Sequence, residues 1–441
     1  MVERDLLVGF GVTNQAVAQA LLEHGHEVVV VDDAPSADAR TAADRLGVEL
    51  VGGPDAAALE ALVRAADVVL PTPGLGDVHP AIDTARRVGI PIRSELDLAA
   101  EWDDRPVVAI TGTDGKTTVT TLATAVLNAS GRSAAAVGNT EVPLVAAIAD
   151  PSIDVFVVEA SSFRLGHSER FAPLVGTWLN VSPDHIDRHG TMHAYVAAKA
   201  AIWHDQAPDQ WAVGNADDPI VLDLLRRAPA QQVTFGLGEA DYRLAGDELR
   251  TPGGEVLARR GDLFRQFPHD ISNALAACAT ALPAGATLDG CREALAAFTG
   301  LPHRISLVAD DGGVRWYDDS KATTPGAALA AMRSFASVVL VAGGRNKGLD
   351  LSALAAGADH IRAVVAIGEA AADVEKAFAG VRPVTVAESM AAAVEAAGEL
   401  AQRGDTVLLS PACASFDWYR SYGERGDDFA SKVRDRIGAA S

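Results

Sequence analysis

Short apolar runs rich in β-branched residues alternate along this chain with Ala- and Leu-rich stretches of helical period. Such alternation is typical of parallel β-sheets wrapped by helices, because each parallel strand is joined to the next by a crossover. It therefore predicts an α/β fold. The expected strands are Leu6 to Gly9, Glu27 to Asp32, Asp67 to Leu70, Val107 to Thr111, Asp154 to Glu159, Gly176 to Asn180, Val314 to Tyr317, Val338 to Ala342, Ala363 to Ile367 and Thr406 to Ser410.

The length of 441 residues, 49% of them hydrophobic, is too great for one ordinary core and too apolar for a disordered chain. A polar stretch at Glu101 to Pro106 and the helix-breaking Thr299-Gly-Leu-Pro302 mark two boundaries. We therefore expect three domains, at residues 1–103, 104–299 and 300–441. A region around residues 241–265 that contains Pro252-Gly-Gly254 predicts a short hairpin.

Composition excludes several classes of protein. Lys and Arg number 37 and Asp and Glu 59, so the net charge of −22 argues against binding to nucleic acid or to an anionic membrane. The apolar runs fall far short of the roughly 18 to 20 residues of a membrane span, and no basic leader opens the chain. Cys278, Cys291 and Cys413 are scattered, which argues against a disulfide scaffold or a structural zinc site. We expect a cytoplasmic, monomeric protein.

The segment Thr111-Gly-Thr-Asp-Gly-Lys-Thr-Thr118 follows an expected strand and opens an expected helix. Backbone N–H groups and the helix dipole at such a turn favour a phosphate. Lys116 would neutralise β- and γ-phosphate charge, and the Thr117 hydroxyl would bind Mg²⁺. The usual pattern has glycine where this chain has Ile110, so we interpret the loop as a shorter variant of the P-loop.

A second glycine-rich segment, Gly9-Phe-Gly-Val-Thr-Asn14, is followed by Asp32 and Asp33 at the end of the next expected strand. This pattern resembles a dinucleotide fingerprint, with Asn14 in place of the third glycine. From the residues alone, binding of NAD, binding of another diphosphate and plain tight packing of the first helix all stay open.

Candidate metal ligands gather in the middle of the chain. Glu159 ends an apolar strand, where it could bind a metal or only be solvated. Asp184-His185-Ile-Asp187-Arg-His189 follows, with His193 and Lys199 downstream. The spacing of His189 and His193 would suit zinc on a helix, but Gly190 disfavours a helix there, so we favour Mg²⁺ shared with Glu159.

Four basic or hydroxyl-rich segments lie after expected strands or at the second boundary. In an acidic chain such loops favour anionic ligands, although solvated charge explains any one of them. The segments are Leu301-Pro-His-Arg304, Asp318-Asp-Ser-Lys-Ala-Thr323, Gly343-Gly-Arg-Asn-Lys347 and Ser410-Pro-Ala-Cys-Ala-Ser415.

Taken together, these segments resemble motifs of the bacterial Mur ligases, and within that family the branch that adds D-glutamate. The resemblance spans all three blocks and is carried by residues 111–118, Glu159-Ala-Ser-Ser-Phe-Arg-Leu165, Leu301-Pro-His-Arg304, Ser320-Lys-Ala-Thr323 and Ser410-Pro-Ala-Cys-Ala-Ser-Phe-Asp417. It implies a Rossmann-like N-terminal domain, a central P-loop ATPase domain with a parallel sheet and a Rossmann-like C-terminal domain.

The same resemblance implies the role of each site residue. UDP-substrate contacts would be Gly11, Val12, Thr13, Asp32, Asp33 and Asn139. ATP contacts would be Gly112, Thr113, Asp114, Gly115, Lys116, Thr117, Thr118, Asn273, Arg304 and Asp319. Two Mg²⁺ ions would be held by Thr117, Glu159, His185 and Lys199, the lysine carrying a carbamate. D-Glutamate would meet Thr323, Lys347, Ser415, Phe416 and Tyr422. Catalysis would depend on Lys116, His185, Lys199, Arg304 and Lys321.

The activity so implied is ATP-dependent formation of an amide between UDP-N-acetylmuramoyl-L-alanine and D-glutamate through an acyl phosphate. The substrate carboxylate, the triphosphate of ATP and the acidic amino acid must come together, so cations are needed to offset their mutual repulsion. The alternatives are a ligase that adds another residue, as in a different Mur step or in folate polyglutamylation, an NAD-dependent dehydrogenase, and a nucleotide-sugar sensor without catalysis.

Overall fold

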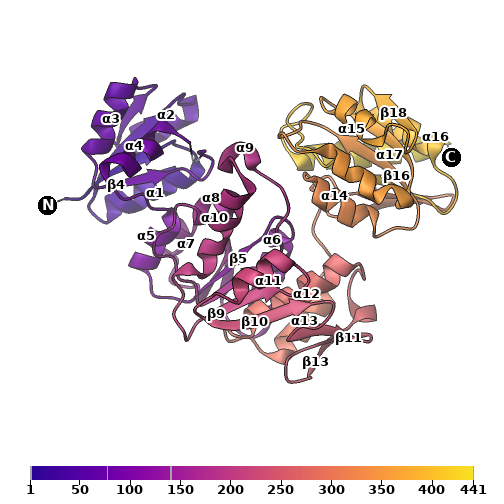
Figure 1. The fold of residues 1–441 in the computed structure, drawn as a ribbon, viewed down its shortest axis with the longest axis horizontal. Coiled ribbons are helices and arrows are strands. Elements are labelled where there is room, and N and C mark those ends of the chain that lie inside the picture. The colour runs from indigo at the N-terminus through magenta and orange to yellow at the C-terminus, as the bar shows by residue number, and fades with distance from the viewer. Residues whose placement is uncertain (1, 77, 140–141, 441) are drawn as a thin grey trace. The chain divides into compact units, whose positions relative to one another are not determined.

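The computed structural model describes residues 2–76, 78–139 and 142–440. Contacts between Cα atoms divide the chain into two compact units. Unit 1 comprises the residues up to Val181, Arg188–Gln266 and Asp270–Phe298, and unit 2 comprises Ser182–Asp187, Phe267–His269 and the residues from Thr299 onward. Figure 1 shows the elements of both along the chain. The division into three domains at residues 103 and 299 stays a prediction.

The first part of unit 1 is a four-stranded parallel sheet in the order β3-β2-β1-β4. Its strands are β1 (Arg4–Val8), β2 (Glu27–Asp32), β3 (Glu49–Gly52) and β4 (Val68–Pro71). Its helices are α1 (Val12–Glu23), α2 (Ala37–Leu46), α3 (Ala56–Arg64), α4 (Pro80–Val88) and α5 (Glu95–Trp102). Side chains of Ser36, Asp55 and Ser94 cap the N-termini of α2, α3 and α5, which fixes where these helices begin.

The rest of unit 1 is built on a nine-stranded sheet in the order β13-β12-β11-β10-β9-β8-β5-β7-β6. Its strands are β5 (Val107–Thr111), β6 (Ala134–Gly138), β7 (Val155–Glu159), β8 (Val175–Trp178), β9 (Trp211–Asn215), β10 (Gln231–Gly236), β11 (Tyr242–Ala245), β12 (Glu248–Arg250) and β13 (Val256–Arg259). The last two pair antiparallel, as the expected hairpin requires. Along β5, Ala109 packs into one core while Val108 and Ile110 pack into the other, so the strand is buried on both faces.

Further helical elements lie between β5 and the next sheet along the chain. They are α6 (Lys116–Ala129), α7 (Leu144–Ala147), α8 (Ser162–Leu165), α9 (Ile186–His189), α10 (Met192–His204), α11 (Pro219–Leu225), the 3₁₀ turn η1 (Arg260–Asp262), α12 (Pro268–Ala281) and α13 (Leu288–Ala297). No helix among the described residues has both the length and the apolar character needed to cross a membrane.

Unit 2 holds a six-stranded sheet in the order β14-β15-β19-β16-β17-β18. Its strands are β14 (Ser306–Asp311), β15 (Val314–Asp318), β16 (Val338–Gly343), β17 (Ile361–Ile367), β18 (Val384–Ala387) and β19 (Thr406–Leu409). Its helical elements are α14 (Pro325–Met332), η2 (Leu351–His360), α15 (Ala371–Phe378), α16 (Met390–Leu400) and α17 (Tyr422–Ala440). All neighbours are parallel except β14 and β15.

The predicted α/β class is therefore confirmed. Strands β2 and β5 have the bounds that the sequence predicts. The strand expected at Gly176 to Asn180 instead spans Val175–Trp178, which leaves Asn180 in the loop beyond it. The edge strand β14, antiparallel to β15, was not expected from the pattern.

Candidate active site

The glycine-rich loop of residues 112–115 joins β5 to α6. Gly115 precedes the helix with φ of +85°, a left-handed conformation that side chains rarely adopt. A Cβ added to Gly115 would lie 2.8 Å from Oδ1 of Asn273 and 3.3 Å from a methyl carbon of Leu179. Glycine is therefore required by conformation and by the close approach of α12. The structure places Asn273 against this loop, and its contact with ATP stays a prediction.

Lys116 is the first residue of α6, and its side chain folds back over the loop. Its ammonium Nζ donates hydrogen bonds of 2.8 Å to the carbonyl of Gly112 and 2.9 Å to that of Thr113. Thr117 follows in the first helical turn, where N–H groups have no partner within the helix. The loop so presents a cation, a hydroxyl and a helix N-terminus together, the combination that phosphate binding uses.

Asn180 fixes the shape of this loop. Its Oδ1 accepts hydrogen bonds from the backbone N–H groups of Thr113, at 3.0 Å, and Asp114, at 2.9 Å. Its Nδ2 donates to the carbonyl of Asp114 at 3.1 Å. Sequence reasoning missed this residue, because its importance depends on β8 lying beside β5 in the sheet.

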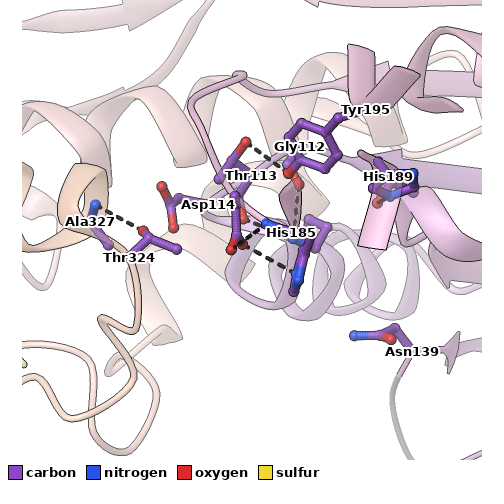
Figure 2. A network of polar contacts seen from close by, with 12 residues as sticks. Gly112, Thr113, Asp114, Asn139, His185, His189, Tyr195, Thr324 and Ala327 are labelled. Carbon is purple, nitrogen blue, oxygen red and sulfur yellow. Dashed lines mark hydrogen bonds and ion pairs between the residues drawn. The ribbon is translucent and has the colours of Figure 1, made fainter. Parts of the chain in front are cut away.

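Lys199 reaches the loop from α10. The side chain is 1% exposed, and Nζ donates a 2.7 Å hydrogen bond to the carbonyl of Gly112. The same ammonium lies 4.6 Å from the centre of the Tyr195 ring, a cation–π arrangement. The hydroxyls of Tyr195 and Thr113 are 3.1 Å apart (Figure 2). One helix thus contacts the loop through two side chains.

Glu159 ends β7 directly beside β5, with Ile110 as its register partner. Its carboxyl group is buried, at 4% exposure of the residue, and Oε1 accepts a 3.0 Å hydrogen bond from Nδ2 of Asn139. The predicted metal carboxylate and the predicted substrate amide are therefore in contact. Thr117 follows β5 by six residues and is half-buried.

The three histidines of the middle segment have different surroundings. His185 adopts φ of +54°, and its Nε2 lies 3.2 Å from the Asp184 carboxylate. His189 is buried, accepts or donates a 2.9 Å hydrogen bond with the Ser162 hydroxyl, and stacks on Phe163 at 5.1 Å. His193 is exposed. Helix α9 ends at His189, so the continuous helix of a zinc hydrolase is absent from this described segment.

The N-terminal glycine loop is held by buried polar contacts. Gly9 has φ of +79°, and a Cβ there would lie 2.6 Å from Cγ2 of Thr72. Asp32 accepts a 2.9 Å hydrogen bond from the backbone N–H of Phe10. Asn14 donates to the carbonyls of Gly9, at 2.8 Å, and Leu70, at 3.1 Å, and so ties α1 to the ends of β1 and β4. Asn14 therefore has a structural role.

The predicted UDP contacts surround this loop. Gly11 is exposed and precedes α1, and Val12 is 71% exposed. Asp33 is exposed and its Oδ2 lies 3.1 Å from Nε2 of His79. Thr13 is half-buried and accepts a 3.1 Å hydrogen bond from Arg164 of α8, a residue that sequence reasoning did not single out for the site.

In unit 2, the carboxyl ends of β15, β19 and β16 meet at one edge of the sheet. Asp319 lies there with 6% exposure, accepting hydrogen bonds from the Ser410 hydroxyl at 2.8 Å and from the N–H of Ile305 at 3.2 Å. Burial raises the pKa of Asp319 to about 7, and the positive charge of Arg304 opposes that rise. Arg304 and Asp319, both predicted ATP contacts, therefore interact electrostatically.

The predicted D-glutamate contacts come from the same edge. The Lys321 ammonium lies 4.0 Å from the centre of the Tyr422 ring. Ser415 is buried, Thr323 and Lys347 are half-buried, and Phe416 is 60% exposed. The backbones of Arg345 and Ala414 exchange hydrogen bonds of 2.8 and 3.0 Å, which joins the loops that carry Lys347 and Ser415.

Arg425 organises this edge, although sequence reasoning missed it. It is 1% exposed and donates to the Ser320 hydroxyl at 2.9 Å, the Ser320 carbonyl at 2.8 Å, and the carbonyls of Cys413 and Ala414 at 3.1 and 3.2 Å. Burial lowers the pKa of Arg425 to about 10. The guanidinium thus links two predicted motif loops with the start of α17.

Comparison with family models gives two matches. Residues 110–281 match the model of the Mur ligase middle domain, and residues 303–413 match the Mur ligase, glutamate ligase domain. Among curated proteins, the chain is 43% identical to the UDP-N-acetylmuramoylalanine–D-glutamate ligase of Frankia casuarinae, over 98% of this chain and 94% of that protein. It is 40% identical to the ligase of the same name from Desulfosudis oleivorans, over 97% and 95%.

Solved structures share the fold at lower sequence identity. The UDP-N-acetylmuramate–alanine ligase of Thermotoga maritima matches with a TM-score of 0.58 and 20% identity, covering 99% of this chain and 100% of that one. A pseudomurein peptide ligase type C of Methanothermus fervidus matches with a TM-score of 0.63 and 19% identity, at the same coverage. These similarities confirm the predicted architecture.

Proposed function

The chain belongs to the Mur ligase family, and we propose that it is the ATP-dependent ligase that joins D-glutamate to UDP-N-acetylmuramoyl-L-alanine in cytoplasmic peptidoglycan synthesis. The observation that carries the proposal is the pairing of β5 with β7: the loop with Lys116 leaves β5, and Glu159 ends the adjacent β7. The curated relatives that share the chain's length and bear this ligase name support the choice of substrates. Both substrates are small molecules.

ATP binding is assigned to the loop of residues 112–118. Asn180 already accepts the N–H groups of Thr113 and Asp114, so the phosphates would be held chiefly by the amides at the start of α6. Lys116 would exchange its two carbonyl partners for β- and γ-phosphate oxygens, which are stronger acceptors because they are charged. Asn273 lies against Gly115, and we assign it to adenine on the strength of the family resemblance alone.

The donors at this loop fit one magnesium ion. Thr117 supplies a hydroxyl and Glu159 a buried carboxylate, both oxygen ligands of the kind Mg²⁺ prefers. Magnesium would neutralise phosphate charge in the transition state. Among the residues described, no three His, Cys, Asp or Glu side chains gather as a ready metal site.

Lys199 does not fit a second metal in its ammonium form, because that nitrogen has no lone pair to offer a metal, and its Nζ donates a hydrogen bond to the Gly112 carbonyl. Reaction of the neutral amine with carbon dioxide would form an N–C bond, release one proton and leave a carboxylate-like group. That carbamate would supply oxygen ligands for a metal ion, and we include it in the proposal on the strength of the family resemblance alone.

The proposed reaction has two steps. The alanyl carboxylate attacks the γ-phosphorus of ATP, the bond to the bridging oxygen breaks, and ADP leaves. The unprotonated amine of D-glutamate then attacks the acyl phosphate, the amide C–N bond forms, and phosphate leaves as the amine loses its proton. Lys116 would stabilise charge in the first step, and we assign the same duty to Arg304 and Lys321.

D-Glutamate recognition is assigned to the loop edge of unit 2. Lys321 and Lys347 provide positive charge, and the hydroxyls of Thr323 and Ser415 provide hydrogen bonds. Tyr422 would keep Lys321 in place through its ring.

A mass-resolved assay tests the proposal directly. The protein is incubated with UDP-N-acetylmuramoyl-L-alanine, ATP, Mg²⁺ and a panel of D- and L-amino acids. We expect a product with the mass of the D-glutamyl amide, formed with one ADP and one phosphate. Preference for another amino acid would identify a related ligase, and no ATP-dependent product with any of them would refute the proposal.

Lys116→Ala provides the matched mechanistic test. We expect turnover to fall by several orders of magnitude, because loss of the loop cation removes transition-state stabilisation. The variant should keep the wild-type circular dichroism spectrum, since Lys116 is partly exposed and its loop is shaped by Asn180. Near-wild-type activity would contradict the role of Lys116.

A further inference from the structure

Arg164 is buried between parts of unit 1 that lie far apart in sequence. It comes from α8, is 4% exposed, and donates hydrogen bonds to three chain segments. Nη2 donates to Oγ1 of Thr13 and to the carbonyl of Gly138, both at 3.1 Å, and Nη1 forms an ion pair with the Glu95 carboxylate. The planar guanidinium thus contacts α1, the end of β6 and the start of α5 at once.

Glu95 extends these contacts. It is 4% exposed, and its second oxygen, Oε2, accepts a 3.0 Å hydrogen bond from the backbone N–H of Val145. Gly138 directly precedes Asn139, and Val145 is the second residue of α7. The Arg164–Glu95 pair therefore contacts the residue before Asn139 and the start of α7.

Asn139 passes the contact on to the metal-candidate carboxylate. Its backbone N–H donates to the Glu159 carbonyl at 2.9 Å, and its side-chain amide donates to Oε1 of Glu159 at 3.0 Å. Hydrogen bonds join Arg164 to Thr13, a predicted UDP-substrate contact, and to Gly138. The next residue in the chain, Asn139, is hydrogen-bonded to Glu159.

Burying this ion pair has a cost that packing alone does not explain. Charged groups removed from water lose hydration, and an apolar pair of similar volume often stabilises a core as well or better. Arg164 also leaves its Nε buried without a hydrogen-bond partner among the described residues. Arg164 is therefore better explained by a need to fix the geometry of the two proposed substrate-binding segments that it contacts than by a gain in stability.

We propose that Arg164 is a positioning residue that sets the substrate loop at Thr13 in register with Asn139 and Glu159. The inference rests on the proposed function, in which one substrate contacts both the N-terminal loop and Asn139. Arg164 acts through these residues and is not itself placed on the reacting atoms. Without Arg164, the loop at Thr13 and the residue Asn139 would no longer be held in a fixed relative position, which weakens binding of this substrate but not of ATP.

The test compares Arg164→Gln with Arg105→Gln. Arg105 is a matched control, because it also pairs with a carboxylate, Asp103, and donates to backbone carbonyls in unit 1, including that of Ile153 at 2.8 Å. For Arg164→Gln we expect the KM for the UDP-substrate to rise at least about tenfold and kcat to fall, with the KM for ATP within about twofold of wild type. Arg105→Gln should lower thermal stability without moving either KM.

Two further variants separate positioning from stability. In Arg164→Gln/Glu95→Gln no buried charge is left unpaired, so stability should recover towards wild type while the KM for the UDP-substrate stays high. Arg164→Lys keeps the positive charge but replaces the planar guanidinium, which has several donors, by a single ammonium. Its KM for the UDP-substrate should therefore also be higher than that of wild type. A KM that recovers with stability in the double variant would overturn the inference, as would an Arg164→Gln variant that differs from Arg105→Gln in neither KM.

Direct binding keeps this outcome separate from the fate of the proposed function. Calorimetric titration with UDP-N-acetylmuramoyl-L-alanine in the absence of ATP should show weaker binding by Arg164→Gln than by wild type and Arg105→Gln. If wild-type protein binds this ligand but adds no D-glutamate, the proposed activity fails while the titration still decides the role of Arg164. Equal affinities of all three proteins would overturn the inference.

Discussion

The close approach of Asn273 to Gly115 allows a quantitative test of how tightly α12 packs against the phosphate loop. In Gly115→Ala the new Cβ would enter a left-handed conformation, at φ of +85°, and would lie 2.8 Å from Oδ1 of Asn273. The conformation costs about 1 kcal/mol, and overpacking against a helix costs about 1–3 kcal/mol more. We therefore expect the free energy of unfolding of unit 1 to fall by about 2–4 kcal/mol.

Gly89→Ala is the control for the conformational part. Gly89 follows α4 with φ of +78°, and a Cβ there meets no heavy atom within 4 Å. Gly89→Ala should therefore lower the free energy of unfolding by only about 1 kcal/mol. Urea unfolding followed by tryptophan fluorescence, with and without ATP, measures both variants.

A double variant isolates the clash. Gly115→Ala combined with Asn273→Ala removes the oxygen that the new methyl group meets, so it should be more stable than the sum of the two single changes implies. Equal losses for Gly115→Ala and Gly89→Ala, or strict additivity in the double variant, would refute the argument that α12 limits the space at this loop.

Three more outcomes follow from unit 2. Asp319 has a pKa raised to about 7 from 3.8, so the folded state holds its proton more tightly than the unfolded state; as pH rises from about 4 to about 7, wild type should lose stability relative to Asp319→Asn, by at most about 1.4 kcal/mol per pH unit in urea titrations, and parallel pH profiles would contradict this. Arg425→Met should destabilise unit 2 by about 3–5 kcal/mol because buried carbonyls lose their donor, and an unchanged urea midpoint would show that these contacts matter little. Tyr422→Leu should raise the KM for D-glutamate while Tyr422→Phe does not, since only the ring faces Lys321, and equal effects of both would exclude that contact.

The sequence predicted the fold best where local pattern and tertiary environment agree. The strands β2 and β5 are strongly β-branched and buried, and their bounds match expectation. Strand β6 was missed because its residues, Ala134-Ala-Ala-Val-Gly138, favour a helix by propensity and become a strand only by pairing with β7. Tertiary pairing overrides local preference at that position.

The site divides in the same way. Lys116 and Glu159 could be recognised because their roles follow from their position after a strand. Asn180, Arg164 and Arg425 could not, because each acts on partners remote in sequence: Arg425 and Ser320 are 105 residues apart. A side chain that positions site residues through partners remote in sequence cannot be recognised from a local motif.

The hold of Asn180 on the phosphate loop bears on the thermodynamics of nucleotide capture. A flexible loop must surrender backbone entropy when it closes around a ligand, about 1–2 kcal/mol for each residue fixed. Here the amide of Asn180 has already ordered Thr113 and Asp114, so that loss is incurred during folding. Affinity for ATP should then be governed by the exchange of Lys116 between carbonyl and phosphate oxygens, and it should weaken with added salt.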